Sequence, residues 1–131
     1  MHLSRTLRAG IVAAVLSGAP STVYALATRR DPLEATLAAG SLVLPRETRR
    51  TRLVAAAVPV HLGLSLGWAV VLDRAGVRGA RAGAVAGVAI AALDLGVVGW
   101  RFPRVRALSL LPQVADHLAY GAVVGVLLKK G

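Results

Sequence analysis

The stretch Pro112-Gln113-Val114-Ala115-Asp116-His117-Leu118-Ala119-Tyr120-Gly121-Ala122-Val123-Val124-Gly125 carries a carboxyl group, an imidazole, an amide and a phenol in a segment otherwise apolar enough to cross a bilayer. Ionisable side chains are costly inside a membrane, and they face a protein interior or a water-filled cavity. The stretch therefore predicts a membrane helix whose polar side faces the rest of the chain. The other apolar segments are expected to form the walls around it.

The composition also favours a membrane protein. Hydrophobic residues make up 56% of the 131 residues, and the mean hydropathy is +0.65. They are gathered in long runs, whereas soluble domains space them at the period of a helix or strand. We predict an all-α polytopic protein with a single transmembrane domain over residues 1–131. The four transmembrane helices are expected at about 7–28, 53–72, 82–100 and 107–128.

A shorter apolar segment, about 33–44, is too short to cross a bilayer. We predict that it forms one short interfacial or re-entrant amphipathic helix, ended by Pro45. The sequence before it is typical of a helix start, with Asp31 as the cap and Pro32 at the first helical position. Glu34 is expected to reach back and complete a capping box.

The first apolar run has two interpretations. Its basic head and the sequence Ala25-Leu26-Ala27 are typical of a secretory signal, which would be cleaved to remove residues 1–27. Ser17, Ser21 and Tyr24, however, recur at helical spacing and form a polar face, which favours a helix that stays and packs. Pro20 predicts a kink in that helix.

The charge distribution indicates the partner. The formal net charge is +10, but the arginines lie in short clusters between the apolar runs, where they would meet lipid headgroups. We therefore expect the lipid bilayer as partner and no nucleic acid. The basic residues divide almost evenly between the two sides, so the orientation stays open. Arg greatly outnumbers Lys and Ala is abundant, which favours a bacterial origin and a multi-pass protein of the plasma membrane.

The candidate site is an intramembrane polar cluster, and three interpretations of it are open. Its members are His61, Asp94, Gln113, Asp116, His117 and Tyr120. Hydrogen bonds among them would hold helices together at about 1 kcal/mol each. An Asp–His chain would instead pass protons, and His61 with His117 would ligate a haem from opposite faces. We favour the first interpretation.

No sequence motif indicates catalysis or a bound cofactor. There is no Cys for a thiolate site or a disulfide, and no zinc, phosphate-loop or nucleophile-elbow motif. We predict no catalytic, cofactor-binding or metal residue. The expected function is a structural or accessory membrane component without enzymatic activity. The alternative is a small proton- or ion-coupled conductor or transporter.

Small residues at four-residue spacing occur in every predicted span, and they have two interpretations. The glycines concerned are Gly63, Gly67, Gly83, Gly87, Gly121 and Gly125. Small faces let helix backbones approach closely, either within one chain or between two copies. The sequence leaves close packing within the monomer and a homo-oligomer equally open.

The order of these features resembles the YagU-like proteins, a group of small bacterial inner-membrane proteins with four helices. The likeness is carried by Val60-His61 with Ser65, by Phe102-Pro103, and by Asp116-His117 before Tyr120-Gly121. The resemblance implies four helices and a location in the plasma membrane. It also implies that His61, Asp116 and His117 are the positions of functional interest.

Overall fold

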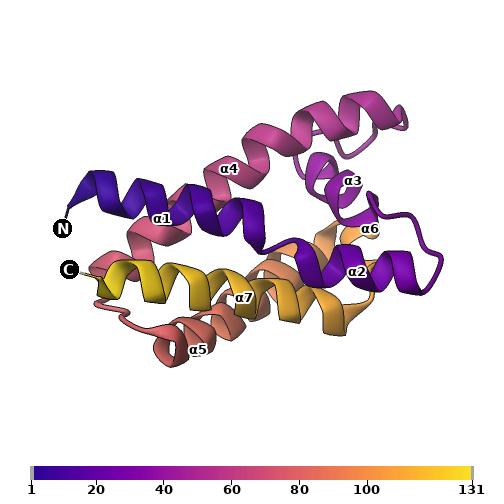
Figure 1. The fold of residues 1–131 in the computed structure, drawn as a ribbon. Coiled ribbons are helices and arrows are strands. Elements are labelled where there is room, and N and C mark those ends of the chain that lie inside the picture. Colours follow the sequence, from indigo (N-terminus) through magenta and orange to yellow (C-terminus); the bar gives the residue numbers. More distant parts are fainter. Residues whose placement is uncertain (1, 131) are drawn as a thin grey trace.

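The computed structural model describes residues 2–130, which are helical with connecting turns and contain no strand (Figure 1). Four helical stretches are long and apolar enough to cross a membrane: Leu3–Ala27, Arg50–Arg74, Ala80–Arg101 and Leu110–Lys129. The predicted all-α fold with four candidate spans is confirmed. The helical bounds lie within a few residues of the approximate predicted ones: arginines or a lysine extend several helices beyond their apolar segments, whereas the last helix begins only at Leu110.

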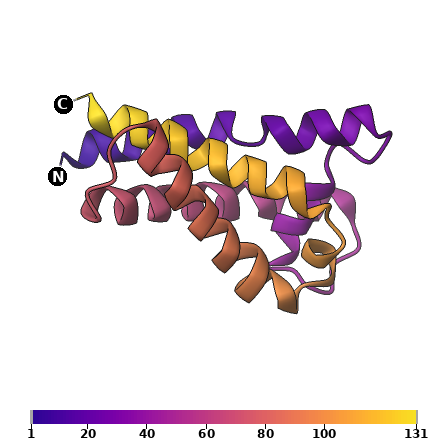
Figure 2. The ribbon, with the colours of Figure 1, turned by 90° about the horizontal axis from the view of Figure 1, so that it is seen from below.

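The helices fold into a bundle with both chain ends on one side (Figures 1 and 2). In chain order they are α1 (Leu3–Leu16), α2 (Ala19–Ala27), α3 (Glu34–Ser41), α4 (Arg50–Arg74), α5 (Ala80–Ala91), the π-helix η1 (Ala92–Val98), the 3-10 helix η2 (Gly99–Arg101), α6 (Pro103–Arg106) and α7 (Leu110–Lys129). α7 packs closely on α5 and also on α1, which in turn packs on α4. The short helices α3 and α6 lie at the end away from the termini.

The outer surface of the bundle is apolar. Val15, Val85 and Leu111 are 77%, 73% and 81% exposed, and at most 39% of the most apolar part of any span is buried by the rest of the chain. A water-soluble domain does not leave so much contiguous apolar surface uncovered. Lipid covers this surface without cost, so the structure is that of a multi-pass membrane protein.

Glycines set the closest helix packing, between α5 and α7. A Cβ added at Gly83 would overlap the Gly121 carbonyl, and one added at Gly87 would overlap the His117 carbonyl. Gly121 and Gly125 are equally crowded by backbone atoms of the facing segment. These four glycines therefore serve packing within the chain.

Gly63 and Gly67 lie on α4 and differ from the glycines of the α5–α7 contact. A Cβ at either position would meet no atom within 4 Å, and both residues are exposed. Self-association through small residues stays a prediction, and on α4 these two positions have the free surface for it.

The first candidate span is broken, where the sequence predicted only a kink. α1 ends at Leu16 and α2 begins at Ala19, with Ser17 and Gly18 in a turn between them. Pro20 follows within the first turn of α2. Because proline has no N–H, it cannot bond to the carbonyl of Leu16 and continue the helix. The break leaves backbone groups of both half-helices without partners in the helix.

The predicted capping box before α3 was wrong. The Asp31 side chain accepts a hydrogen bond from the Leu33 N–H at 2.9 Å and forms an ion pair with Arg50. Glu34 does not reach back, because it pairs with Arg30 at 3.0 Å. These guanidinium partners leave the box unformed, and α3 begins at Glu34 rather than at Pro32. The hydrogen bonds from Arg50 and Leu33 lower the pKa of Asp31 to about 2.

α3 is also shorter than the predicted helix over 33–44. It ends at Ser41, three residues before Leu44 and ahead of Pro45, which was expected to stop it. The helix packs on α4, and a Cβ at Gly40 would overlap the Leu53 carbonyl. Contact with α4 therefore places this helix against the bundle, whereas its position relative to lipid headgroups stays a prediction.

Two prolines lie at helix starts, and one buried carboxylate joins two helices. Pro103 begins the short helix α6 after the third span has ended, and Pro112 lies in the first turn of α7, where a proline is tolerated without a kink. Asp73 lies buried in the last turn of α4. It accepts hydrogen bonds from the Thr6 hydroxyl at 2.5 Å and from Arg78 at 2.7 Å. This contact ties the start of α1 to the end of α4.

Candidate functional site

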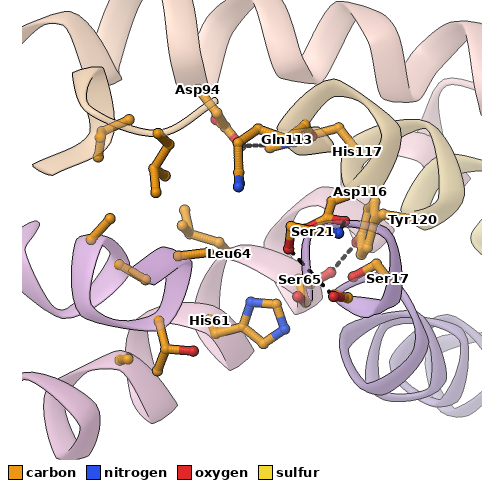
Figure 3. A pocket seen from close by; sticks show the side chains of 18 of the residues that line it. Ser17, Ser21, His61, Leu64, Ser65, Asp94, Gln113, Asp116, His117 and Tyr120 are labelled. Atoms are coloured by element: carbon orange, nitrogen blue, oxygen red, sulfur yellow. Dashed lines mark hydrogen bonds and ion pairs between the residues drawn. The ribbon is translucent and has the colours of Figure 1, made fainter. Parts of the chain in front are cut away.

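A partly open cavity of about 440 Å³ lies among the spans, toward the end of the bundle where α3 and α6 lie. All six residues of the predicted polar cluster line it (Figure 3). His61 comes from α4 and Asp94 from η1, and the other four come from α7. The structure thus brings the six together around one space. Their participation in a function stays a prediction.

Asp94 and His117 form the one direct ion pair within this cluster. His117 Nε2 lies 3.2 Å from Asp94 Oδ2, and His117 Nδ1 lies 2.7 Å from the Gln113 carbonyl oxygen. A carbonyl oxygen only accepts, so Nδ1 carries a hydrogen. In a neutral imidazole Nε2 then carries no hydrogen and can only accept, and an ionised carboxylate can also only accept. Two acceptors do not bond, so the contact requires one proton between Nε2 and the Asp94 carboxylate, carried by one of the two side chains.

The π-helix sets the position of Asp94. α5 changes into η1 at Ala92, and the Gly99 N–H bonds to the Asp94 carbonyl, five residues earlier. Such π turns inside α-helices are frequent at functional sites, because they shift side chains relative to the regular helix. A Cβ at Gly99 would lie 2.6 Å from Val105 and 2.7 Å from the Asp94 carbonyl. A residue without a side chain is therefore needed where the π turn closes.

Asp116 lies at the N-terminus of the second half-helix, α2. Its carboxylate accepts a hydrogen bond from the Ser21 N–H at 2.8 Å. The break in the span leaves this N–H without a carbonyl partner in its own helix, and the partial positive charge of a helix N-terminus favours an anion there. A side chain of α7 thus caps a half-helix of the first span.

His61 lies at the C-terminus of the first half-helix, α1. Its Nε2 lies 2.7 Å from the carbonyl oxygen of Ala14, so the imidazole is the donor. The two sides of the break therefore meet a carboxylate and an imidazole from two other spans. Discontinuous membrane helices bind substrates and ions in many transporters, through the exposed ends of their half-helices.

Tyr120 and Gln113 hold the site together. The Tyr120 hydroxyl donates to the Ser65 carbonyl of α4 in a buried hydrogen bond. Gln113 is buried, with 7% of the residue exposed, and its backbone carbonyl orients the His117 ring as described. These contacts fix α7 relative to α4 and fix the imidazole relative to Asp94.

The sequence did not indicate the contribution of Ser21 to the site. Its polar face was recognised, but the group that matters is its backbone N–H, which only the break exposes. Pro20 was the available signal, since a proline inside a membrane helix frees backbone groups that another segment must satisfy.

The haem interpretation finds competing contacts. His61 Nε2 and both ring nitrogens of His117 already lie within hydrogen-bonding distance of protein partners. To bind a haem iron, His117 would have to give up one of its two partners. His61 would have to give up the Ala14 carbonyl or bind the iron through Nδ1. Residues 2–130 contain no group of three or more His, Cys, Asp or Glu side chains arranged to hold a metal ion.

Comparison with known proteins leaves the geometry as the basis for a functional interpretation. No family model matches the chain, and no curated protein or solved structure is significantly similar to it. The resemblance to the YagU-like proteins stays a prediction.

Proposed function

We propose that the protein is a small proton-translocating carrier of the bacterial plasma membrane and not an enzyme. The observation that carries the proposal is the cavity itself. A broken helix borders it, together with a carboxyl–imidazole pair that shares a proton and a second carboxylate that caps a half-helix. We place the protein with the YagU-like group as part of the same proposal.

The proposed proton sites are the Asp94–His117 pair and Asp116. The side chains of Asp94 and His117 are 24% and 20% exposed, so they are shielded but still reachable from the cavity. A proton added to the pair, or removed from it, leaves an unbalanced charge within the membrane. Such a charge is costly there, so proton movement is expected to be coupled to a rearrangement of the surrounding helices.

The proposed moving element is α2. Protonation of Asp116 would remove the negative charge that complements the N-terminus of this half-helix. α2 packs chiefly on α7, and a Cβ at Gly18 would meet no atom within 4 Å, so the turn before α2 has space around it. Its far end is held by the hydrogen bond between Tyr24 and Ser109. Protonation of Asp116 would therefore release the start of α2 while its other end stays held, and this movement would change the access to the cavity.

A structural or accessory role is the second candidate, and one observation favours it. Within residues 2–130, no buried side-chain nitrogen or oxygen lacks a hydrogen-bond partner. If the polar groups only hold helices together, every buried polar group also needs a hydrogen-bond partner. It does not need an open cavity at the position of those groups, and for that reason we prefer the carrier.

Reconstitution into liposomes with an internal pH-sensitive dye tests the proposal. Under an imposed membrane potential, we expect proton influx for the wild-type chain and its loss in Asp116→Asn and His117→Ala. Asp31→Asn removes a carboxylate that does not line the cavity and should leave the influx unchanged. Unfolding curves in detergent check that each variant is folded. No influx above protein-free liposomes, with lower stability of the site variants, would support the structural role instead.

A further inference from the structure

We infer that the cavity binds a lipophilic monovalent cation, with Asp116 as its counter-ion. The ligand class is a quaternary phosphonium or ammonium ion that carries aromatic or alkyl groups. This inference rests on the proposed function, because it names the substrate of the same cavity. Charge, volume and the apolar wall each support it.

The charge of the cavity is opposite to that of the whole chain. The protein has 16 Lys and Arg residues and a formal net charge of +10, yet none of these 16 residues lines the cavity. The ionisable side chains that line the cavity with Asp116 are His61 of α4, Asp94 of η1, and His117 and Tyr120 of α7. The Asp94–His117 pair is neutral as a unit because it shares one proton. Asp116, when ionised, adds a charge of −1, and no Lys or Arg lies in the lining to balance it.

Asp116 also has room for a ligand. One of its oxygens accepts the Ser21 N–H at 2.8 Å, whereas an ionised carboxylate offers about four acceptor positions over two oxygens. The ion pairs formed within residues 2–130 leave Asp116 out, since each joins other side chains. An ionised carboxylate without a cationic partner attracts a cation more strongly in a cavity shielded from water than at an open surface.

The rest of the wall selects for an apolar ligand. Apolar side chains such as Leu64, Leu95 and Val98 make up most of the lining, and Trp68 and Tyr120 add aromatic rings. Aromatic rings attract organic cations through their electron-rich faces. The volume of about 440 Å³ lies within the range of about 300–1,000 Å³ that is usual for small-molecule sites.

The partly open cavity has an apolar wall on α4 and η1. Leu64 and Val98, which line it, are 45% and 48% exposed. Leu64 points into the space between His61 and the polar residues of α7 (Figure 3). A small inorganic cation would lose its hydration water against such apolar side chains, whereas a lipophilic cation packs against them. The wall therefore fits the lipophilic ion.

Cation binding and proton binding are mutually exclusive at Asp116. When the cation binds, the proton on the Asp116 carboxyl group leaves to water, so the charge in the cavity stays balanced. Affinity for the cation should accordingly fall as the pH is lowered. The carrier would then exchange lipophilic cations for protons.

Two probes of the same shape and opposite charge test the inference: tetraphenylphosphonium and tetraphenylborate. We expect the purified protein in detergent to bind tetraphenylphosphonium by equilibrium dialysis and to bind tetraphenylborate far more weakly. Asp116→Asn should weaken binding of the cation by about tenfold or more while keeping an oxygen to accept the Ser21 N–H. Asp31→Asn is the matched control and should bind as the wild-type protein does.

A second variant keeps the test decisive if Asp116→Asn does not fold. Leu64→Trp places a larger side chain in the cavity from a partly exposed position on α4. It should abolish cation binding with little change in stability. Equal binding of the two probes, or wild-type cation affinity in both Asp116→Asn and Leu64→Trp, would overturn the inference.

The same samples separate this inference from the proposed function. Proton influx without phosphonium binding would refute the ligand class and keep the proton carrier. Phosphonium binding that depends on Asp116, without proton influx in liposomes, would support the cation site and refute proton translocation.

Discussion

The close packing of α5 on α7 gives a prediction whose size follows from the structure. Gly121 lies near the middle of α7, where a Cβ would overlap the Gly83 carbonyl and lie 2.8 Å from the Gly87 nitrogen. All of these are backbone atoms, so no flexible side chain can move aside. We expect Gly121→Ala to force the two helices apart and to destabilise the fold.

Gly63→Ala is the matched control, and it allows the magnitude to be isolated. Both glycines lie near the middle of a long helix, but a Cβ at Gly63 meets no atom within 4 Å. Replacing Gly by Ala inside a helix favours the helix by about 0.5–1 kcal/mol at either site. That gain cancels in the comparison, whereas overpacking costs about 1–3 kcal/mol at Gly121 alone. Gly121→Ala should therefore be about 1–3 kcal/mol less stable than Gly63→Ala.

The assay is reversible unfolding in mixed micelles, with the helical circular dichroism signal followed as sodium dodecyl sulfate is added. The free energy of unfolding is compared among the wild type and the two variants. If Gly121→Ala and Gly63→Ala unfold at the same detergent fraction, the close approach of α5 and α7 is wrong. A loss at Gly63 instead would indicate that this exposed face of α4 packs against another copy of the chain.

Three further predictions use the same unfolding or transport assays. Thr6→Val removes the hydroxyl that donates to buried Asp73 and should cost about 1–3 kcal/mol, whereas Ser4→Ala, at an exposed position, should cost little. The pKa of Asp31 is lowered from 3.8 to about 2, so its stabilising contribution is complete above about pH 4 and lost as the pH falls through 2. Wild type and Asp31→Asn should therefore differ in unfolding midpoint at pH 5 and converge near pH 2; a constant difference would contradict this assignment. Pro20→Ala restores an N–H to the broken span and should reduce proton influx without loss of stability, so unchanged influx would argue against α2 as the moving element.

The fold class follows from the sequence because hydropathy is a property of each segment by itself. A run of apolar residues about as long as a bilayer is thick needs no knowledge of its neighbours to be assigned to lipid. Helix is then the form in which an isolated segment satisfies its own backbone hydrogen bonds. Competition between a helix cap and nearby arginines for the same carboxylate was harder to foresee, as Asp31 and Glu34 show. Both carboxylates pair with arginines, one of them nineteen residues away, instead of capping α3.

The polar residues were recognisable for the same local reason, but their partners were not. His61, Asp94 and Asp116 are conspicuous in apolar segments because lipid makes them costly. That Asp94 meets His117 depends on the π turn of η1 and on the register of α5 against α7, which the glycine contacts set.

The sequence by itself determined which segments leave water and which side chains need hydrogen-bond partners there. Only the tertiary structure decided that the first span breaks at Ser17 and Gly18 and that its two ends meet Asp116 and His61. The physical reason is that a freed backbone group accepts any suitable partner within reach. Distances between separate helices decide which partner that is, and they are a property of the packed bundle.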